Sequence, residues 1–292
     1  PVTSHTTGGL VMGARDFADF CTDNQEVITE LVERFSDYEP TGGLDDAKLS
    51  HWLKQFQPQH RELALKVAES IHYYGIHEVN KLMATMHKLV VQQIEAGGAA
   101  ANDVSFVPLG ITGESGEDIA RRYRNVNGLH GWRDRFVKAA QLPERIFQSK
   151  TPTVFFLDDF IGTGDQVVGY WEEVLSQLVP DYIGIYLVVV AAMPDGARRI
   201  ESATPIRVLP VHTVPTRHQI LSGACQRFSP HEKRTVCHYC DKIGNKPMGY
   251  GDCGLLLSFA YGTPNNSVSV IRGSKGQRSW RGLLPGWEDL QD

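Results

Sequence analysis

Two adjacent aspartates, Asp158 and Asp159, end a run of apolar residues and stand just before a glycine-rich turn. The segment Val154–Gln166 reads VFFLDDFIGTGDQ, the pattern of a strand that leads through a loop into a helix. Two neighbouring carboxylates can accept hydrogen bonds from adjacent hydroxyls of a sugar, and their oxygens can also hold a divalent cation. The segment therefore predicts a site for sugar hydroxyls or a metal ion.

The turn after the aspartates predicts a phosphate site. Backbone N–H groups at a helix N-terminus lack partners within the helix, and the helix dipole favours an anion there. Asp165 is unfavourable beside a phosphate unless its carboxylate points away or meets a cation. The residues of the turn are Ile161, Gly162, Thr163, Gly164, Asp165 and Gln166.

A second glycine-containing turn follows the first expected strand, and two interpretations of it stay open. In one, the turn binds a phosphate, and Arg121, Arg122 and Arg124 supply positive charge. In the other, Ser115 caps a helix whose arginines face solvent. A capping serine and a phosphate-binding turn share the same geometry. The residues of this turn are Gly113, Glu114, Ser115 and Gly116.

Four of the five cysteines lie close together in the sequence, at Cys225, Cys237, Cys240 and Cys253. The C-x-x-C pair and its two flanking cysteines would allow a four-cysteine zinc site. Structural zinc sites usually join two short-spaced pairs, and only one pair here is short, so buried packing thiols are the alternative. The odd number of cysteines argues against a disulfide framework and for a reducing compartment.

The elements that must position these residues fall into two parts. Residues 21–100 carry apolar side chains at helical spacing, which predicts an N-terminal helical extension that ends at Gly97–Gly98. In residues 101–292, short apolar strands alternate with helices, which predicts an α/β fold with a mainly parallel sheet and flanking helices. Residues 1–20 are expected to be a disordered or artificially added N-terminus.

In an open α/β sheet, ligands bind outside the carboxyl ends of the strands, where we expect Asp158 and Asp159. Tyr182–Ala192 is apolar throughout and suits a central strand buried on both faces. The expected strands are Val104–Leu109, Thr153–Leu157, Tyr182–Ala192, Ile206–Val211 and Leu255–Tyr261. The expected helices are Asp23–Phe35, Ala47–Phe56, one or two between Leu63 and Gly97, Glu117–Tyr123, about Arg133–Ala140, about Gly164–Leu178 and Asp195–Ser202.

The bulk composition excludes several classes of function. The net charge of -5 and the pI near 6.1 provide no global positive field, so strong direct binding of nucleic acid is not expected. No apolar run has the length of a membrane span, and no secretion signal begins the sequence. A cytoplasmic setting without membrane contact is expected.

The apolar run, the acidic pair and the Thr-Gly loop resemble the signature of type I phosphoribosyltransferases. The resemblance implies that Asp158 and Asp159 hold the ribose hydroxyls of phosphoribosyl pyrophosphate, PRPP, with Mg²⁺ as the cofactor. It also implies that the loop 161–166 holds the 5′-phosphate, with the Thr163 hydroxyl as a donor, and that the turn 113–116 holds the leaving pyrophosphate. Phe160, Gly162, Asp165 and Gln166 depart from the usual residues of the signature, which weakens the expectation of an ordinary 5′-phosphate contact.

A more specific resemblance rests on WLKQF at Trp52–Phe56, Leu157–Gln166 and MGYGDCGLLLSFAYGTPNNS at Met248–Ser267. Together these segments resemble PRTase-CE, a phosphoribosyltransferase-like family of bacterial conflict systems, from about Trp52 to Pro285. The resemblance implies an effector or an associated module in anti-phage loci, some of which contain reverse transcriptases. It also suggests that Asn265 and Asn266 present amides to a nucleobase or ribose, with an ordinary turn as the alternative.

The sequence is compatible with two functions. The first is a phosphoribosyltransferase-like enzyme that acts on a phosphoribosyl or nucleotide substrate, or that cleaves a nucleotide such as NAD as a toxic effector. The second is a non-catalytic module that senses a nucleotide or binds a partner in a defence complex, for example a reverse transcriptase. A receiver-like or flavodoxin-like protein is disfavoured, because no lysine lies between Lys150 and Lys233.

Overall fold

Four apolar segments form one parallel sheet in the computed structural model, which describes residues 16–110, 115–244, 246–273, 280–286 and 290. The strand order is β2-β3-β4-β5, the same as the order along the chain. β4 lies between β3 and β5 and is almost wholly buried, as its continuous apolar run predicts. The strands are β2 (Val104–Pro108), β3 (Thr153–Ile161), β4 (Gly184–Ala192) and β5 (Arg207–Thr213).

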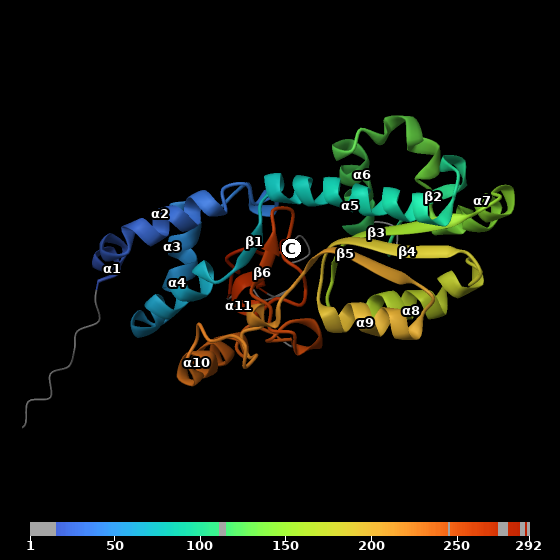
Figure 1. The fold of residues 1–292 in the computed structure, drawn as a ribbon. Coiled ribbons are helices and arrows are strands. Elements are labelled where there is room, and N and C mark those ends of the chain that lie inside the picture. Colours follow the sequence, from blue (N-terminus) through green and yellow to red (C-terminus); the bar gives the residue numbers. More distant parts are fainter. Residues whose placement is uncertain (1–15, 111–114, 245, 274–279, 287–289, 291–292) are drawn as a thin grey trace, which may run out of the picture.

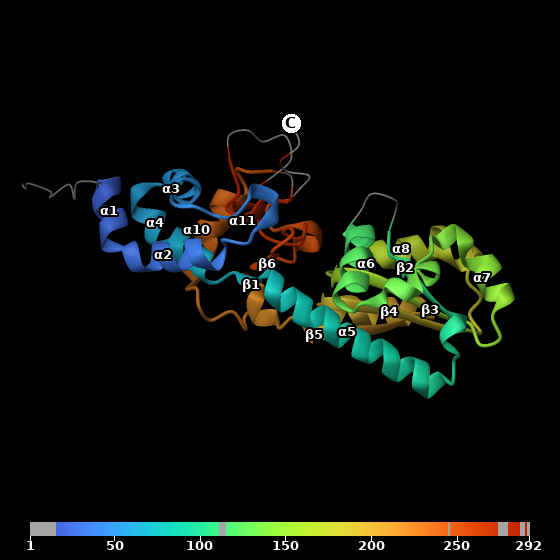
Figure 2. The ribbon, with the colours of Figure 1, turned by 90° about the horizontal axis from the view of Figure 1, so that it is seen from above.

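Helices cover both faces of this sheet (Figures 1 and 2). α5 and α6 bury residues such as Met86 and Tyr123 on one face, against Phe106 and Leu157. α7, α8 and α9 share the core of the other face, which includes Phe156. The predicted α/β class, a mainly parallel sheet with flanking helices, is confirmed. These helices are α5 (Ile76–Gly97), α6 (Ser115–Val126), α7 (Leu142–Gln148), α8 (Asp165–Glu173) and α9 (Pro194–Ala203).

The predicted N-terminal helices are also present. The helix expected at Asp23–Phe35 corresponds to α2, and a break follows it where Gly42 and Gly43 adopt positive φ angles of 70° and 89°. α5 ends at Gly97, as predicted, because Gly98 adopts the left-handed conformation with φ 64°. The predicted helices before α5 are α2 (Gln25–Arg34), α3 (Asp46–Lys54) and α4 (Arg61–Glu69), and they are preceded by α1 (Phe17–Asp23), which was not predicted.

The first four helices share a hydrophobic core with the end of the chain rather than forming one of their own. Trp52 of α3 packs in the same core as Val236 of α10 (Pro230–Cys240) and Ile271 of α11 (Ser269–Arg272). The indole N–H of Trp52 also donates to the Val270 carbonyl at 2.8 Å. We call α1–α4, β1 and the chain from residue 214 onward the terminal lobe, and α5 through β5 the sheet lobe. The sequence predicted a division of the chain at residue 100. In the structure, the first four helices instead share a core with residues from the end of the chain.

A separate two-stranded sheet lies where the two lobes meet (Figure 1). β1 (His72–Tyr74) pairs in parallel with β6 (Leu257–Phe259). The strand expected at Leu255–Tyr261 therefore exists, but it pairs with β1 and not with the main sheet. β1 interrupts a stretch whose apolar spacing predicted helix, because its pairing partner lies far away in the sequence.

Two further helices differ from expectation. The stretch about Arg133–Ala140 forms the 3₁₀ turns Leu129–Arg135 and Ala139–Gln141 instead of a helix. Between these turns the Val137 N–H donates to the Phe106 carbonyl at 2.9 Å, so the backbone follows the edge of β2. α8 stops at Glu173, and the 3₁₀ turn Leu175–Gln177 follows it.

The N-terminal segment 1–20 is described only from residue 16 onward. Its last four residues belong to α1, because Asp16 caps the helix and Phe20 is buried in the core of the terminal lobe. Within the described residues, none of the helices combines the length and the apolar character needed to cross a bilayer.

Candidate functional site

Asp158 and Asp159 lie within β3, near its carboxyl end. β3 is longer than the predicted Thr153–Leu157, because Asp158 and Phe160 pair with Val189 and Ala191 of β4. The Asp158 carboxylate accepts a hydrogen bond from the Asp159 N–H at 2.9 Å. Both side chains are partly buried. The structure thus places the acidic pair at the edge of the sheet where the sequence predicted a site.

The surroundings of Asp159 favour a ligand that offers hydrogen-bond donors or positive charge. Burial raises the pKa of Asp159, and the nearby Asp118 of α6 raises it further, while hydrogen bonds to Asp158 and Phe160 oppose the rise. Burial raises the pKa of the Tyr261 hydroxyl, and the nearby carboxylates of Asp159 and Asp158 raise it further, so this residue of the terminal lobe lies near the acidic pair. Ribose hydroxyls and a divalent cation both meet the need of such a carboxylate pair.

The turn after β3 is packed tightly on both sides. Gly164 precedes α8 with φ 81°, and a Cβ at this position would lie 2.6 Å from the carbonyl oxygen of Gly196 in α9. A Cβ at Gly162 would overlap the carboxamide of Asn266, which comes from the terminal lobe. Both glycines are therefore required by the close approach of neighbouring groups.

Asp165 meets a cation, which was one of the two conditions the sequence set for a phosphate at this turn. One of its carboxylate oxygens pairs with Nε of Arg199 at 2.6 Å, and the other accepts a hydrogen bond from the Thr163 hydroxyl at 2.9 Å. The hydroxyl predicted to bind phosphate is thus held by a carboxylate of its own loop. Ile161 is buried at the end of β3, and Gln166 is exposed in the first turn of α8.

The turn predicted at residues 113–116 lies mostly outside the described residues, namely at Gly113 and Glu114. Ser115 begins α6, as the capping interpretation and the phosphate interpretation both expected. A Cβ at Gly116 would overlap the Leu109 carbonyl, so α6 begins against the chain that leaves β2. The start of α6 therefore lies at the same edge of the sheet as the aspartates.

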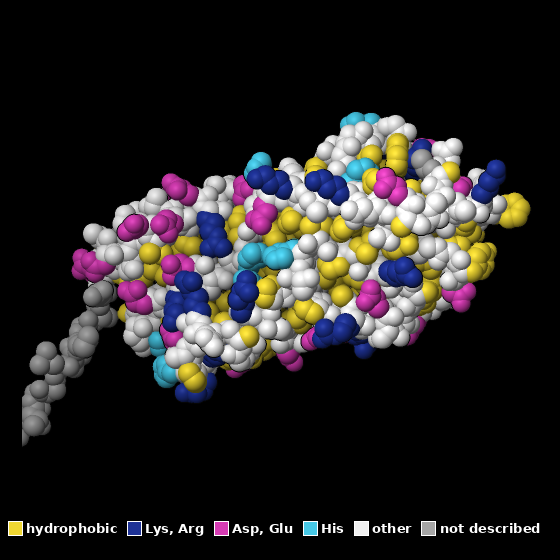
Figure 3. Space-filling model, viewed as in Figure 1, with side chains coloured by type: hydrophobic (Ala, Val, Ile, Leu, Met, Phe, Trp, Pro, Cys, Tyr) yellow, Lys and Arg dark blue, Asp and Glu magenta, His cyan; other side chains and the backbone are white. Residues whose placement is uncertain are grey.

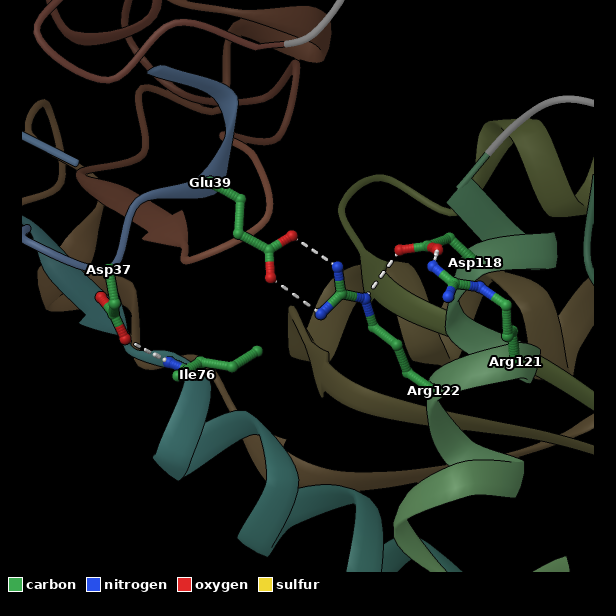
Figure 4. Close-up of polar contacts among 6 residues, drawn as sticks. All are labelled: Asp37, Glu39, Ile76, Asp118, Arg121 and Arg122. Atoms are coloured by element: carbon green, nitrogen blue, oxygen red, sulfur yellow. Dashed lines mark hydrogen bonds and ion pairs between the residues drawn. The ribbon is translucent and has the colours of Figure 1, made fainter. Parts of the chain in front are cut away.

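Arg122 of α6 joins the sheet lobe to the terminal lobe (Figure 4). Its Nη1 and Nη2 donate to the two carboxylate oxygens of Glu39 at 3.0 and 2.5 Å, and its Nε donates to Asp118 at 2.7 Å. The guanidinium also lies 5.3 Å from the ring centre of Tyr261, the residue beside Asp159. Arg122 is thus a largely buried cation held between Glu39, Asp118 and Tyr261, with only 19% of its side chain exposed.

The other two arginines predicted near this turn are bound elsewhere. Arg121 pairs with Asp118, one turn earlier on α6, and Arg124 lies 5.6 Å from the ring centre of Phe136. Figure 4 shows a second link between the lobes, in which Asp37 accepts a hydrogen bond from the Ile76 N–H at the start of α5, at 2.7 Å. Each arginine of α6 therefore has a partner within the protein. This differs from both interpretations, which expected either a solvent-exposed face or three arginines free to bind phosphate.

The two asparagines predicted to recognise a base or ribose differ in their positions. Asn266 is buried, and its amide donates to the Tyr250 carbonyl at 3.0 Å and to the sulfur of Cys253 at 3.4 Å. Asn265 is exposed, and its carbonyl accepts the Tyr250 N–H at 2.7 Å. Both shape the segment that covers the loop after β3. Direct contact of their amides with a ligand stays a prediction.

The structure does not bring together the four cysteines of the predicted zinc site. Cys225 and Cys240 are buried in the core of the terminal lobe, whereas Cys253 belongs to the core beneath α5 and α6. Cys237 contacts the sulfur of Met248 at 4.0 Å. All five cysteines are free, and within the described ranges no three His, Cys, Asp or Glu side chains are arranged to hold a metal ion.

Two residues of the site were missed from the sequence. Glu39 lies on a 3₁₀ turn of the terminal lobe and reaches the site only because the lobes meet. Tyr261 lies within the segment Met248–Ser267 but carries no spacing signal of its own. Only the family resemblance drew attention to that segment.

The chain also matches a known protein family. The family model PRTase-CE matches residues 49–285, which is most of the chain. A comparison with curated proteins finds no match.

Proposed function

Since the chain belongs to the PRTase-CE family and contains a phosphoribosyltransferase-like domain, we propose that it is an enzyme acting on a phosphoribosyl or nucleotide substrate. The observation that carries the proposal is the acidic pair Asp158 and Asp159 at the carboxyl end of β3, shortly before the loop 162–165 and near Tyr261. Fold alone would not support an activity, so the proposal rests on this site.

In the proposed reaction, Asp158 and Asp159 accept hydrogen bonds from the ribose hydroxyls and hold the sugar in place. The bond at the anomeric carbon breaks through a state that resembles an oxocarbenium ion, so positioning of the sugar and stabilisation of the leaving group dominate catalysis. Arg122, which contacts Tyr261, would contribute positive charge to a phosphate group after it leaves Glu39. Arg199 places a second positive charge beside the loop after β3.

Asp158 and Asp159 could hold a magnesium ion only if the substrate supplied further ligands. Mg²⁺ is usually bound by one or two carboxylates and completed by water and substrate phosphates. Asp158 and Asp159 supply two hard oxygen ligands, and the described residues contain no larger group of ligands that could hold an ion without substrate. When bound, the ion would neutralise phosphate charge.

A specific observation favours a second candidate, a non-catalytic module that binds a nucleotide or a defence partner. The Thr163 hydroxyl is held by Asp165, and Arg122 is held by Glu39. Both groups would have to change partners before they could bind a substrate phosphate.

The test is incubation of the purified protein with Mg²⁺ and PRPP, NAD or a panel of nucleotides, followed by chromatography of the products. The variant Asp158→Asn/Asp159→Asn removes both charges and keeps the shape of the side chains. The matched control is Asp181→Asn, an exposed residue ahead of β4 at the opposite edge of the sheet. Turnover by the wild type and by Asp181→Asn, reduced at least 100-fold in the double variant, is expected.

Two results would contradict the enzymatic proposal. If the wild type binds a nucleotide but consumes none, even with its genomic partners present, the binding module is the better interpretation. If the double variant turns over substrate as fast as the wild type, the acidic pair is not the site.

We further propose, from the family alone, that this activity serves anti-phage defence. A bacterial host that carries the gene with its neighbours should resist phage, and Asp158→Asn/Asp159→Asn should abolish the resistance without lowering the protein level. Equal plaque counts with and without the gene across a phage panel would remove the basis for this role.

A further inference from the structure

A cavity of about 460 Å³ lies in the terminal lobe, away from the acidic pair. Its walls come from the end of α2, the chain from α4 into β1, and the segment from Arg217 to Phe228. None of its lining residues belongs to β3 or to the loop after it. The volume falls within the range of small-molecule sites.

The walls of this cavity carry an excess of positive charge. Arg34, Arg217 and Arg227 line it together with one carboxylate, Glu69. Glu69 pairs with Arg227 at 3.3 Å, whereas Arg34 donates to the backbone carbonyls of Glu69 and Ile71. Arg217 makes no ion pair within the part of the chain that the structure describes. Three arginines against one carboxylate give the cavity a positive charge, although the net charge of the protein is -5.

Two histidines in the walls add polar atoms without partners. The rings of His72 and His218 lie 4.7 Å apart between centres. The Nε2 atom of each is buried and has no hydrogen-bond partner among the described residues. Burial and the neighbouring positive charges lower the pKa of both, that of His72 to about 4, so both rings are neutral near pH 7.

We propose that this cavity binds a phosphorylated small molecule of nucleotide size. Arg34, Arg217 and Arg227 would hold the phosphate, and the neutral rings of His72 and His218 would form the wall beside the ligand. Arginine suits this role, because its planar group binds phosphate through two parallel hydrogen bonds. Figure 3 shows histidine side chains in the middle of the face that contains β1, with lysine or arginine side chains close by. The proposal does not depend on the activity proposed for Asp158 and Asp159.

The test is isothermal titration calorimetry with AMP as the probe, and with adenosine and inorganic phosphate for comparison. The variant is Arg217→Gln/Arg227→Gln, which removes two exposed arginines of the cavity. The control of equal charge is Arg133→Gln/Arg198→Gln, which removes two exposed arginines elsewhere. Arg217→Gln alone leaves no ionic partner behind, and it provides a second variant if the double variant unfolds.

AMP should bind the wild type and the control with the same dissociation constant, and the Arg217→Gln/Arg227→Gln variant at least 10-fold more weakly. Adenosine should bind at least 10-fold more weakly than AMP, because it lacks the phosphate. Asp158→Asn/Asp159→Asn should retain a site that depends on Arg217, which separates this cavity from the proposed active site. The proposal is overturned if AMP binds the arginine variants as tightly as the wild type or fails to bind the wild type at millimolar concentration. It is also overturned if a single-stranded oligonucleotide binds through Arg217 far more tightly than AMP.

Discussion

At the residue scale, the site depends on small groups that allow close approach. Gly162 lies directly under the Asn266 carboxamide, and Gly164 lies against the Gly196 carbonyl. The sequence predicted that these glycines belong to a phosphate-binding loop. The structure adds a second reason for them, which is that α9 and the terminal lobe both press on the loop.

The change Gly162→Ala is expected to lower the free energy of unfolding by about 1–3 kcal/mol, because the new Cβ overlaps the Asn266 carboxamide. Urea denaturation followed by circular dichroism measures the effect. The matched control is Gly169→Ala in α8, where no atom lies within 4 Å of the added Cβ. There the change should be neutral or stabilise by about 0.5–1 kcal/mol. Equal effects of the two changes would show that the loop can move away.

At the element scale, β1 places a histidine among positive charges. His72 is surrounded by His218, His212, Arg34 and Arg217, and these groups together with burial lower its pKa to about 4. The strand also joins the lobes, because Tyr74 hydrogen-bonds His212 of β5 and stacks on Phe259 of β6.

This environment predicts a loss of stability in mild acid. Between pH 6.5 and about 4 the unfolded chain protonates His72 while the folded chain does not, so the free energy of unfolding falls as the pH falls. Allowing for its partial exposure, we expect about 1 kcal/mol from His72 between pH 7 and pH 5. Urea denaturation at a series of pH values measures this loss.

The variant His72→Gln should show a smaller loss over the same pH range, because it removes the titrating group. His51→Gln, which changes an exposed histidine of α3, serves as the control and should keep the slope of the wild type. If both variants match the wild type, another group is responsible for any acid sensitivity.

The cysteines of α10 lead to a prediction about metal. Because Cys253 belongs to a different core from Cys225 and Cys240, we expect no stabilising zinc site. Treatment with a strong chelator should leave the thermal midpoint unchanged within about 1 °C, whereas loss of a structural zinc would lower it by many degrees. Zinc that copurifies near one equivalent per chain would contradict this expectation.

At the scale of the whole molecule, the proposed active site lies where the two lobes meet. The sheet lobe supplies Asp158, Asp159 and Arg122, and the terminal lobe supplies Glu39 and Tyr261. The ion pair between Arg122 and Glu39 therefore links the lobes at the site itself (Figure 4).

A double-mutant cycle with Glu39→Gln and Arg122→Gln should reveal this link. We expect a coupling energy of about 0.5–1.5 kcal/mol, since the pair is bidentate and partly buried. The control cycle uses Asp195→Asn and Arg198→Gln, an exposed pair within α9, for which about 0–0.5 kcal/mol is expected. Urea denaturation of each single and double variant provides both values. Equal coupling in the two cycles would show that the link between the lobes adds nothing to stability.

The sequence by itself determined the features that depend on local pattern. Apolar runs identified every strand of the main sheet, and helical spacing identified the N-terminal helices from α2 onward. The position of Asp158 and Asp159 at the carboxyl end of β3 also followed, because a strand, an acidic pair and a glycine turn are adjacent in the chain.

Only the tertiary structure decided which distant segments meet. The pairing of β1 with β6, the core shared by Trp52 and Ile271, and the contact of Glu39 with Arg122 all join residues far apart in the sequence. Such contacts leave no periodic signal in the local pattern, because they arise from the packing of surfaces and not from the spacing of neighbours. For the same reason, the acidic pair and the arginines of α6 were visible in the sequence, whereas Glu39, Tyr261 and the arginine-lined cavity became visible only in the folded chain.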